Sequence, residues 1–253
     1  MLGAIIGDFV GSYYEFNAVK TKDFDLFPVG SKFTDDTILT LATAHAILNK
    51  EDYGKSYKNF FWQYPLKNYG ERFYAWGKRD DSEPYNSFGN GSAMRVAPVG
   101  WAFNIIEQVL EEAKKSAEVT HNHPEGIKGA QAVASAIFLA RTGASKKTIK
   151  EYIELNFEYD LDRSVDEIRE TAVFNETCMI SVPEAIICFL DSESFEDALR
   201  NAVSLGADAD TQACIAGAIA EAFYKEIPDF IREEVLKRLP KKFHGMIDEI
   251  LTA

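Results

Sequence analysis

The stretch "QACIAGAIAEAF", from Gln212 to Phe223, is unusually rich in small residues. A second stretch with the same character, "GAQAVASAIFLA", runs from Gly129 to Ala140. Small side chains let the backbones of two helices approach closely, so both stretches are predicted to be central helices around which the others pack. Whatever precedes such a helix is held rigidly. The residues just before Gln212 are therefore good candidates for a functional site.

Apolar residues recur at spacings of three and four along the chain, whereas the strict alternation typical of strands is absent. Further helices are expected over about 211–226, 229–238 and 241–251. The sequence has no internal repeat, no low-complexity tract and no linker. We therefore predict an all-α fold in which residues 1–253 form a single compact multi-helix domain.

Two more helix boundaries are suggested by capping residues. Ser181, followed by Pro183 and Glu184, has the form of a capping box that would begin the helix "VPEAIICFL". Ser194 is expected to begin "FEDALRNAVSL", and Gly206 to end it as a C-cap.

Composition limits the possible partners. Among 253 residues, 40 Asp and Glu against 27 Lys and Arg give a net charge of −13, which argues against nonspecific binding to nucleic-acid phosphates. A small molecule or a protein partner fits better. The start "MLGAIIGDFVGS" has no basic region, and "MISVPEAIICFL" is too short and polar for a membrane span. The three cysteines show no CxxC spacing, so we expect a cytoplasmic protein with no membrane association.

Acidic residues are paired at two predicted helix starts. Asp35 and Asp36 follow Thr34, and Asp208 and Asp210 precede Thr211 about 170 residues later. One carboxylate at a helix start is ordinary capping chemistry, but two exceed what a cap needs. If the two starts face each other, four carboxylates share a small volume, where like charges about 4 Å apart repel by several kcal/mol.

Two divalent cations would neutralise these four charges. Oxygen ligands without His or Cys favour Mg²⁺ or Mn²⁺ over zinc. The alternative is that the two clusters are independent, solvated helix caps.

A glycine-rich segment, "YNSFGNGSAMRVAP" from Tyr85 to Pro98, has the composition of a backbone-amide nest for anionic oxygens. The alternative is an ordinary turn. Aromatic residues around it could stack on a base, although core packing is the more frequent role of such residues: Phe73, Tyr74, Trp76, Tyr85 and Phe88.

These motifs, in this order, resemble the ADP-ribosylglycohydrolase family, which includes the dinitrogenase-reductase-activating glycohydrolase and the ADP-ribosyl-acceptor hydrolases. The resemblance rests on "GAIIGDFVGSYYEF", "FTDDT", "PYNSFGNGSAMRVAPVG", "THNHPEGIKGAQAVASAIFLAR" and "GADADTQACIAGAIAEAFY". It implies a compact all-α fold, a dinuclear Mg²⁺ or Mn²⁺ site, and hydrolysis of the bond between ADP-ribose and an acceptor, with release of ADP-ribose.

Matched residue by residue, the resemblance implies a set of site residues. The implied metal ligands are Thr34, Asp35, Asp36, Asp208, Asp210 and Thr211. Glu15 matches an acidic residue that takes part in catalysis in some members, and the general base is expected to be Glu15 or a metal-site aspartate such as Asp36. The implied substrate-binding residues are Gly89, Asn90, Gly91, Ser92, Met94 and His121.

Two other functions remain open at this point. One is a Mg²⁺-dependent hydrolase of another phosphorylated metabolite, and the other is a non-catalytic ADP-ribose-binding protein. The expected substrate is an ADP-ribosylated protein or small molecule, and the expected oligomeric state is a monomer. The sequence does not identify the acceptor of ADP-ribose or decide between Mg²⁺ and Mn²⁺.

Overall fold

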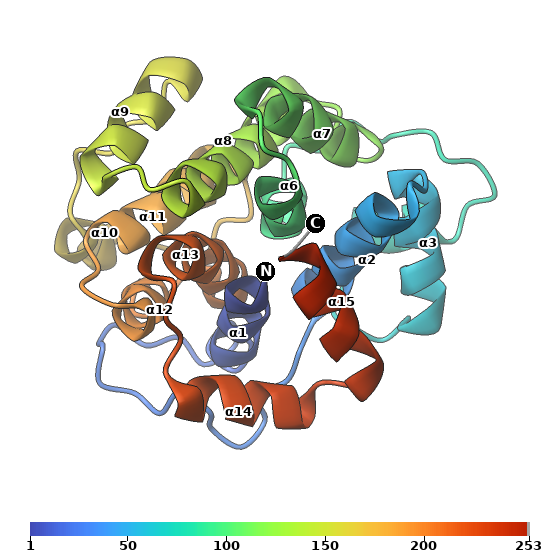
Figure 1. Cartoon of the computed structure of the whole chain (residues 1–253). Helices are drawn as coiled ribbons and strands as arrows, with labels where there is room; N and C mark the ends of the chain where they lie inside the picture. The colour runs from blue at the N-terminus through green and yellow to red at the C-terminus, as the bar shows by residue number, and fades with distance from the viewer. Residues whose placement is uncertain (252–253) are drawn as a thin grey trace.

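The computed structural model describes residues 1–251, and within them fifteen α-helices account for most of the chain (Figure 1). Their bounds are α1 Leu2–Gly11, α2 Asp35–Asn49, α3 Tyr53–Gln63, α4 Glu71–Gly77, α5 Gly91–Met94, α6 Ala97–Ala102, α7 Ile106–Glu118, α8 Pro124–Arg141, α9 Lys146–Phe157, α10 Val165–Thr171, α11 Cys178–Leu190, α12 Phe195–Val203, α13 Ala209–Tyr224, α14 Asp229–Arg238 and α15 His244–Ile250. A 3₁₀ turn, Lys241–Phe243, precedes α15. The all-α prediction is confirmed.

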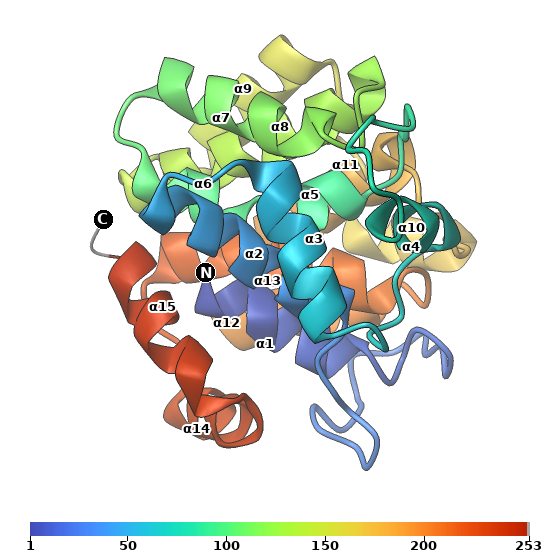
Figure 2. The same ribbon diagram turned by 90° about the vertical axis from the view of Figure 1, so that its right-hand side faces the viewer.

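Helices α1 and α13 occupy the middle of the molecule in both views (Figures 1 and 2). Helices α7, α8 and α9 lie on one side of this pair and α14 on the other. Every residue of α1 is buried, and α13 packs against α1, α8, α11 and α12. The predicted central helices therefore are central, because α8 and α13 contain the two stretches rich in small residues.

The α1–α13 pair is unusually close because glycines lie at its crossing. Gly3, Gly7 and Gly11 recur every four residues along one face of α1. A methyl group at Gly7 would lie 2.0 Å from the carbonyl oxygen of Ala213, and one at Gly3 would lie 2.3 Å from that of Gly217. No side chain larger than hydrogen fits there without moving a backbone.

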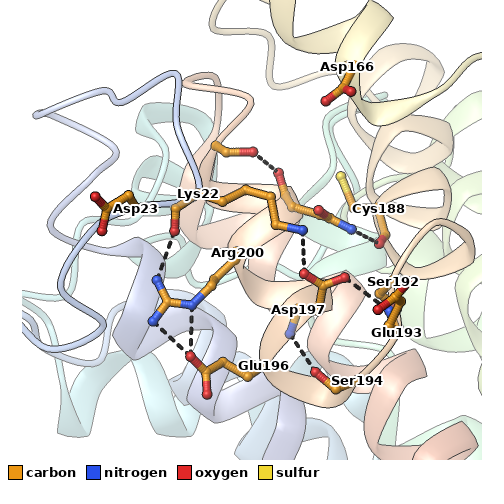
Figure 3. A network of polar contacts seen from close by, with 12 residues as sticks. Lys22, Asp23, Asp166, Cys188, Ser192, Glu193, Ser194, Glu196, Asp197 and Arg200 are labelled. Atoms are coloured by element: carbon orange, nitrogen blue, oxygen red, sulfur yellow. Dashed lines mark hydrogen bonds and ion pairs between the residues drawn. The ribbon is translucent and has the colours of Figure 1, made fainter.

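The segment between α1 and α2 is fixed against α12 (Figure 3). Arg200 donates hydrogen bonds of 2.9 Å to the carbonyl oxygens of both Lys22 and Phe24. Lys22 forms an ion pair with Asp197, which also lies in α12. These contacts hold the part of the segment around Lys22 and Phe24, while the amide of Glu15 donates to the carbonyl oxygen of Gly11 at 3.1 Å.

Most predicted helix boundaries agree with the structure, but the start of α11 does not. This helix begins at Cys178 instead of following Ser181, and Pro183 lies inside it. The amide of Cys178 donates to the carbonyl oxygen of Phe88 at 3.0 Å, and the amide of Asn90 donates to that of Glu176 at 2.7 Å. This pairing between distant segments sets the start of the helix.

Smaller differences occur near α12 and α13. Ser194 caps α12 as expected, but the helix ends at Val203 and its C-cap is Ser204. Gly206 lies two residues farther on, with a φ of +61°. Helix α13 begins at Ala209, two residues earlier than expected. Within the described residues, no helix is long and apolar enough to cross a membrane.

Candidate functional site

The two acidic helix starts open into one pocket with a volume of about 400 Å³. Asp35 and Asp36 lie in the first turn of α2, where the Thr34 hydroxyl accepts a hydrogen bond from the amide of Asp36. Asp208 is the N-cap of α13, and Asp210 lies in its first turn. All four aspartates line the pocket. The two starts therefore face each other, as a shared site requires.

The electrostatics of this pocket are unfavourable without a cation. Burial raises the pKa of Asp36, and the charges of Asp210 and Asp8 raise it further. Burial and Asp208 likewise raise the pKa of Asp210. Burial raises the pKa of Glu15 to about 8, with a further contribution from Asp210. Among residues 1–251, no Lys, Arg or His side chain forms an ion pair with any of these carboxylates.

The donor atoms suit a hard divalent cation. Oδ1 of Asp36 and Oε2 of Glu15 are buried and have no hydrogen-bond partner in the described part of the chain. Carboxylate and hydroxyl oxygens are the ligands that Mg²⁺ and Mn²⁺ prefer. Within residues 1–251, however, no three His, Cys, Asp or Glu side chains already form a ligand set around one point. The donor atoms thus suit such cations, but the side chains are not arranged as a complete ligand set.

Asp8 is a site-supporting residue that the sequence patterns did not single out. Its side chain is fully buried in α1 and accepts hydrogen bonds from the amide and the hydroxyl of both Thr34 and Thr37. These bonds attach the start of α2 to α1 and orient Asp36. An aspartate inside the apolar run "GAIIGDFVG" was the signal that could have identified it.

Two threonines were expected beside the metals, and they differ in position. Thr211 lines the pocket, and its hydroxyl contacts the sulfur of Met94 at 3.8 Å. Thr34 is buried and does not line the pocket. Its hydroxyl donates to Oδ1 of Asp8 at 2.7 Å.

The glycine-rich segment forms another part of the pocket wall. The expected substrate-side residues that line the pocket are Gly89, Asn90, Gly91, Met94 and His121. Ser92 lies beneath this wall, where its hydroxyl donates to the carbonyl oxygen of Gly126 at 2.7 Å. Nδ2 of Asn90 donates to Oδ2 of Asp208 at 2.6 Å. This bond links the glycine segment directly to the acidic cluster.

The glycines in this segment serve close packing. Neither Gly89 nor Gly91 has a positive φ, and Gly91 is the first residue of α5. A methyl group at Gly91 would lie 3.2 Å from Nε2 of His121. The absence of side chains therefore gives the imidazole edge access to the pocket wall.

Residues that were not among the expected site residues also line the pocket, among them Arg72, Phe73, Tyr85 and Arg95. Of the aromatic residues considered for stacking, Trp76 belongs to the core with 1% of its surface exposed, and Phe88 is 40% exposed outside the pocket wall. Arg95 is fully buried. The sequence places Arg95 in the glycine-rich segment but does not indicate its partners, which lie around the end of α7.

The model of the ADP-ribosylglycohydrolase family matches residues 1–253. The chain belongs to the ADP-ribosylglycohydrolase family. The resemblance seen in the sequence motifs is thereby confirmed. The protein is a hydrolase of this family, and the family acts on ADP-ribose joined to an acceptor.

The relatives agree with this assignment. The chain is 29% identical to the human ADP-ribosylhydrolase ARH3, with 88% of this chain and 84% of that protein aligned. It is 26% identical to the ADP-ribosylarginine hydrolase Tri1 of Pseudomonas putida (strain GB-1), over 88% of this chain and 69% of that protein. A solved ADP-ribosylglycohydrolase-related protein complex aligns with a TM-score of 0.74 at 24% identity, covering 99% of this chain and 95% of the other. That likeness shows a shared fold.

Proposed function

We propose that this protein hydrolyses the glycosidic bond between the distal ribose of ADP-ribose and an acceptor, and releases ADP-ribose. The observation that carries the proposal is the composition of one pocket of about 400 Å³. It combines four aspartates from two helix starts, Glu15, the glycine-rich segment and His121. An acidic cluster that suits cations thus shares one pocket with a glycine-rich segment, whose lack of side chains leaves room for a diphosphate.

We further propose that the acidic wall holds two Mg²⁺ or Mn²⁺ ions. The proposed ligands are Asp35 and Asp36 at the start of α2, and Asp208, Asp210 and Thr211 at the start of α13. Thr34, which does not line the pocket, would support this set through its hydrogen bonds with Asp8 and Asp36. Bound ions would orient the ribose hydroxyls and a water molecule and would offset the charge of the four carboxylates.

Glu15 is the proposed general base. Its carboxyl group lines the same pocket as Asp36, and burial raises its pKa to about 8. A carboxylate with a pKa near the working pH is well suited to accept a proton from an attacking water. Asp36 is the second candidate, because its Oδ1 has no hydrogen-bond partner in the described residues.

The glycine-rich segment is proposed to bind the diphosphate and the adjoining ribose. Gly89, Asn90, Gly91 and Met94 would contribute pocket-facing groups. Ser92 would contribute through its backbone, because its hydroxyl is already bonded to Gly126.

A panel of substrates tests this proposal. Proteins ADP-ribosylated on arginine or on serine, together with O-acetyl-ADP-ribose, are incubated with the enzyme in Mg²⁺ and in Mn²⁺. We expect free ADP-ribose from at least one substrate, and loss of that product in Glu15→Gln and Asp36→Asn. Glu151→Gln, an exposed acid on α9, is the control and should remain active. Release of phosphate or AMP instead of ADP-ribose would contradict the proposal.

A further inference from the structure

Behind the glycine-rich wall, three buried side chains form a hydrogen-bonded row. A guanidinium nitrogen of Arg95 donates to the hydroxyl oxygen of Thr120 at 2.8 Å. The same oxygen lies 2.7 Å from Nδ1 of His121. Arg95 and Thr120 have no exposed surface, and His121 is only 5% exposed. Bulk water therefore does not compete for the hydrogen bonds among these three side chains.

Arg95 is an unusual residue to bury in this way. Among residues 1–251 it has no carboxylate partner, and its Nε and one terminal nitrogen have no hydrogen-bond partner. Its other terminal nitrogen also donates to the carbonyl oxygen of Ser116 at 3.0 Å, and its guanidinium carbon lies 4.1 Å from the centre of the Tyr57 ring. Burying an unpaired cation is costly, which argues for a role beyond packing.

The protons along this row can be arranged so that they fix the tautomer of His121. A guanidinium can only donate, so the Thr120 hydroxyl is the acceptor in its bond with Arg95. When the single proton of that hydroxyl points toward Nδ1 of His121, 2.7 Å away, the ring nitrogen accepts it. A neutral imidazole that accepts at Nδ1 carries its proton on Nε2.

Tyr85 is the remaining neighbour of this hydroxyl, and its ring centre lies 5.9 Å from that of His121. Burial raises the pKa of Tyr85 to about 12, so the phenol keeps its proton. A protonated phenol can either donate to the second lone pair of the Thr120 oxygen or accept the proton of Thr120, and only the first arrangement leaves that proton for Nδ1 of His121.

Burial, together with nearby positive charges, keeps His121 neutral. Burial lowers its pKa well below the ordinary value, and the positive charges of Arg95 and Arg72 lower it further. A second proton, which would have to sit on Nδ1, is therefore disfavoured. His121 cannot act as a proton donor of the imidazolium type near neutral pH.

The other ring nitrogen faces the ligand side. His121 lines the pocket, and Nε2 lies next to the positions where Gly89 and Gly91 lack side chains, 3.7 Å and 3.2 Å from where methyl groups would be. Among the described residues, Nε2 makes no hydrogen bond. Its proton points toward space that a ligand can occupy.

We propose that Arg95 and Thr120 are positioning residues that hold His121 in the Nε2-protonated tautomer, so that it offers one fixed hydrogen-bond donor to a ligand oxygen beside the glycine-rich segment. The tautomer is a property of the free protein, and the inference rests on the proposed function only where it takes that oxygen to belong to ADP-ribose. A phosphoryl or hydroxyl oxygen satisfies this donor. A ligand group that itself only donates does not.

Nitrogen-15 NMR of the imidazole in the wild-type protein is the direct test. Protonated and unprotonated ring nitrogens have well-separated chemical shifts, so the spectrum reports the tautomer of His121 without any variant or ligand. Assignment of the His121 signals uses His121→Gln, which removes them. We expect a neutral ring with the proton on Nε2 at pH 7. A proton on Nδ1, or an equal mixture of tautomers, would overturn the inference.

Two variants test the part played by Thr120. Thr120→Val keeps the shape of the side chain but removes the hydroxyl, whereas Thr120→Ser retains it. We expect Thr120→Val to lose the tautomer preference and to bind ADP-ribose about tenfold more weakly by calorimetry, as loss of one well-placed donor predicts. Thr120→Ser should keep both properties. A folded Thr120→Val that retains the wild-type tautomer and affinity would refute the role of Thr120.

The two proposals fail separately. If the free protein has the Nε2-protonated tautomer but neither binds ADP-ribose nor releases it from substrates, the proposed function fails and the arrangement of Arg95, Thr120 and His121 stands. If ADP-ribose is released but the proton lies on Nδ1, the inference about Arg95, Thr120 and His121 fails and the proposed function stands.

Discussion

Buried acidic residues in this protein differ in what surrounds their oxygens. Asp8 accepts four hydrogen bonds from Thr34 and Thr37, so its charge is matched by protein donors. Asp36 lies two residues beyond Thr34, yet its Oδ1 has no partner in the described residues. The number of hydrogen-bond donors that the protein places around a carboxylate, and not its burial, separates a structural carboxylate from one that is open to a cation or to substrate.

Asp210→Asn should separate metal binding from folding. The substitution keeps the size of the side chain but removes one of four clustered negative charges, whose repulsion raises the pKa of its neighbours. We expect Mn²⁺ affinity, measured by calorimetry, to fall at least tenfold. The thermal midpoint of the metal-free protein should stay the same or rise, because repulsion is relieved.

The matched control is Asp23→Asn, an exposed aspartate in the segment between α1 and α2. It should leave both quantities unchanged. Normal Mn²⁺ stoichiometry and affinity in Asp210→Asn would remove Asp210 from the proposed ligands.

Because His121 is neutral in the folded protein, its contribution to the free energy of unfolding changes with pH in a known direction. Its pKa is lowered in the folded protein but lies near 6.5 in the unfolded chain. Below pH 6.5 the unfolded chain binds a proton that the folded protein does not, so this residue makes the fold less stable as the pH falls. In His121→Gln this contribution is absent.

Urea unfolding of both proteins at pH 7.5 and 5.5 measures the effect. The other three histidines are common to both proteins, so their contributions cancel. We expect the stability of wild type relative to His121→Gln to be about 1 kcal/mol lower at the acid pH. Equal pH slopes would mean that His121 titrates normally.

Single residues were predictable from sequence only where local patterns mark them. The paired aspartates at 35–36 and 208–210 stand out because each pair precedes an apolar run with a threonine beside it. Arg95 and Thr120 carry no such mark, since they meet only after α5 and the end of α7 have packed together. The roles of the predicted site residues stay predictions until they are measured.

At the scale of elements, close helix crossings depend on missing side chains. Gly7 of α1 faces Ala213 of α13, where a methyl group would meet the carbonyl oxygen at 2.0 Å. Gly7→Ala must therefore move one of two buried helices. We expect a loss of at least about 3 kcal/mol in the free energy of unfolding, measured in urea, because overpacking of a rigid contact is added to the loss of apolar packing.

Gly245→Ala on α15 is the matched control, since among residues 1–251 nothing lies within 4 Å of the place that its methyl group would take. There the substitution should be neutral or stabilise by about 0.5–1 kcal/mol, because alanine favours helix and restricts the unfolded chain. A Gly7→Ala protein as stable as Gly245→Ala would show that α1 and α13 can move apart at little cost in free energy.

Helix starts were predictable where capping is local and not where a distant segment decides. Thr34 caps α2 through its own side chain, and the sequence identifies it. The start of α11 is decided by pairing with residues 88–90, which lie almost ninety positions earlier. The Ser181 capping pattern was therefore misleading: its hydroxyl donates to the carbonyl oxygen of Thr177 within the helix.

At the scale of the whole molecule, we propose that the chain is one domain. Helices from the beginning, the middle and the end of the sequence, namely α1, α8 and α12, all pack directly on α13. Differential scanning calorimetry of the protein should then show one cooperative transition, with calorimetric and van't Hoff enthalpies that agree. Two resolved transitions would contradict a single domain.

If the acidic pocket holds cations as proposed, the stability of the whole molecule should depend on them. The chain has a net charge of −13, and four carboxylates with no cationic partner in the described residues face one pocket. Cations that bind there would stabilise the folded protein by mass action, by about 2.7 kcal/mol at a concentration one hundred times the dissociation constant. For a chain of this size that corresponds to a rise of several degrees in the thermal midpoint.

We therefore expect EDTA to abolish ADP-ribose release and to lower the thermal midpoint relative to the Mg²⁺-loaded protein. Screening of the net negative charge by salt would also stabilise the fold, so each comparison is made at one ionic strength fixed with NaCl. Asp210→Asn distinguishes the two effects further, because it should lose the Mg²⁺-dependent shift while its response to NaCl remains. Full activity and an unchanged thermal midpoint in EDTA would contradict the proposal that the four clustered aspartates bind cations.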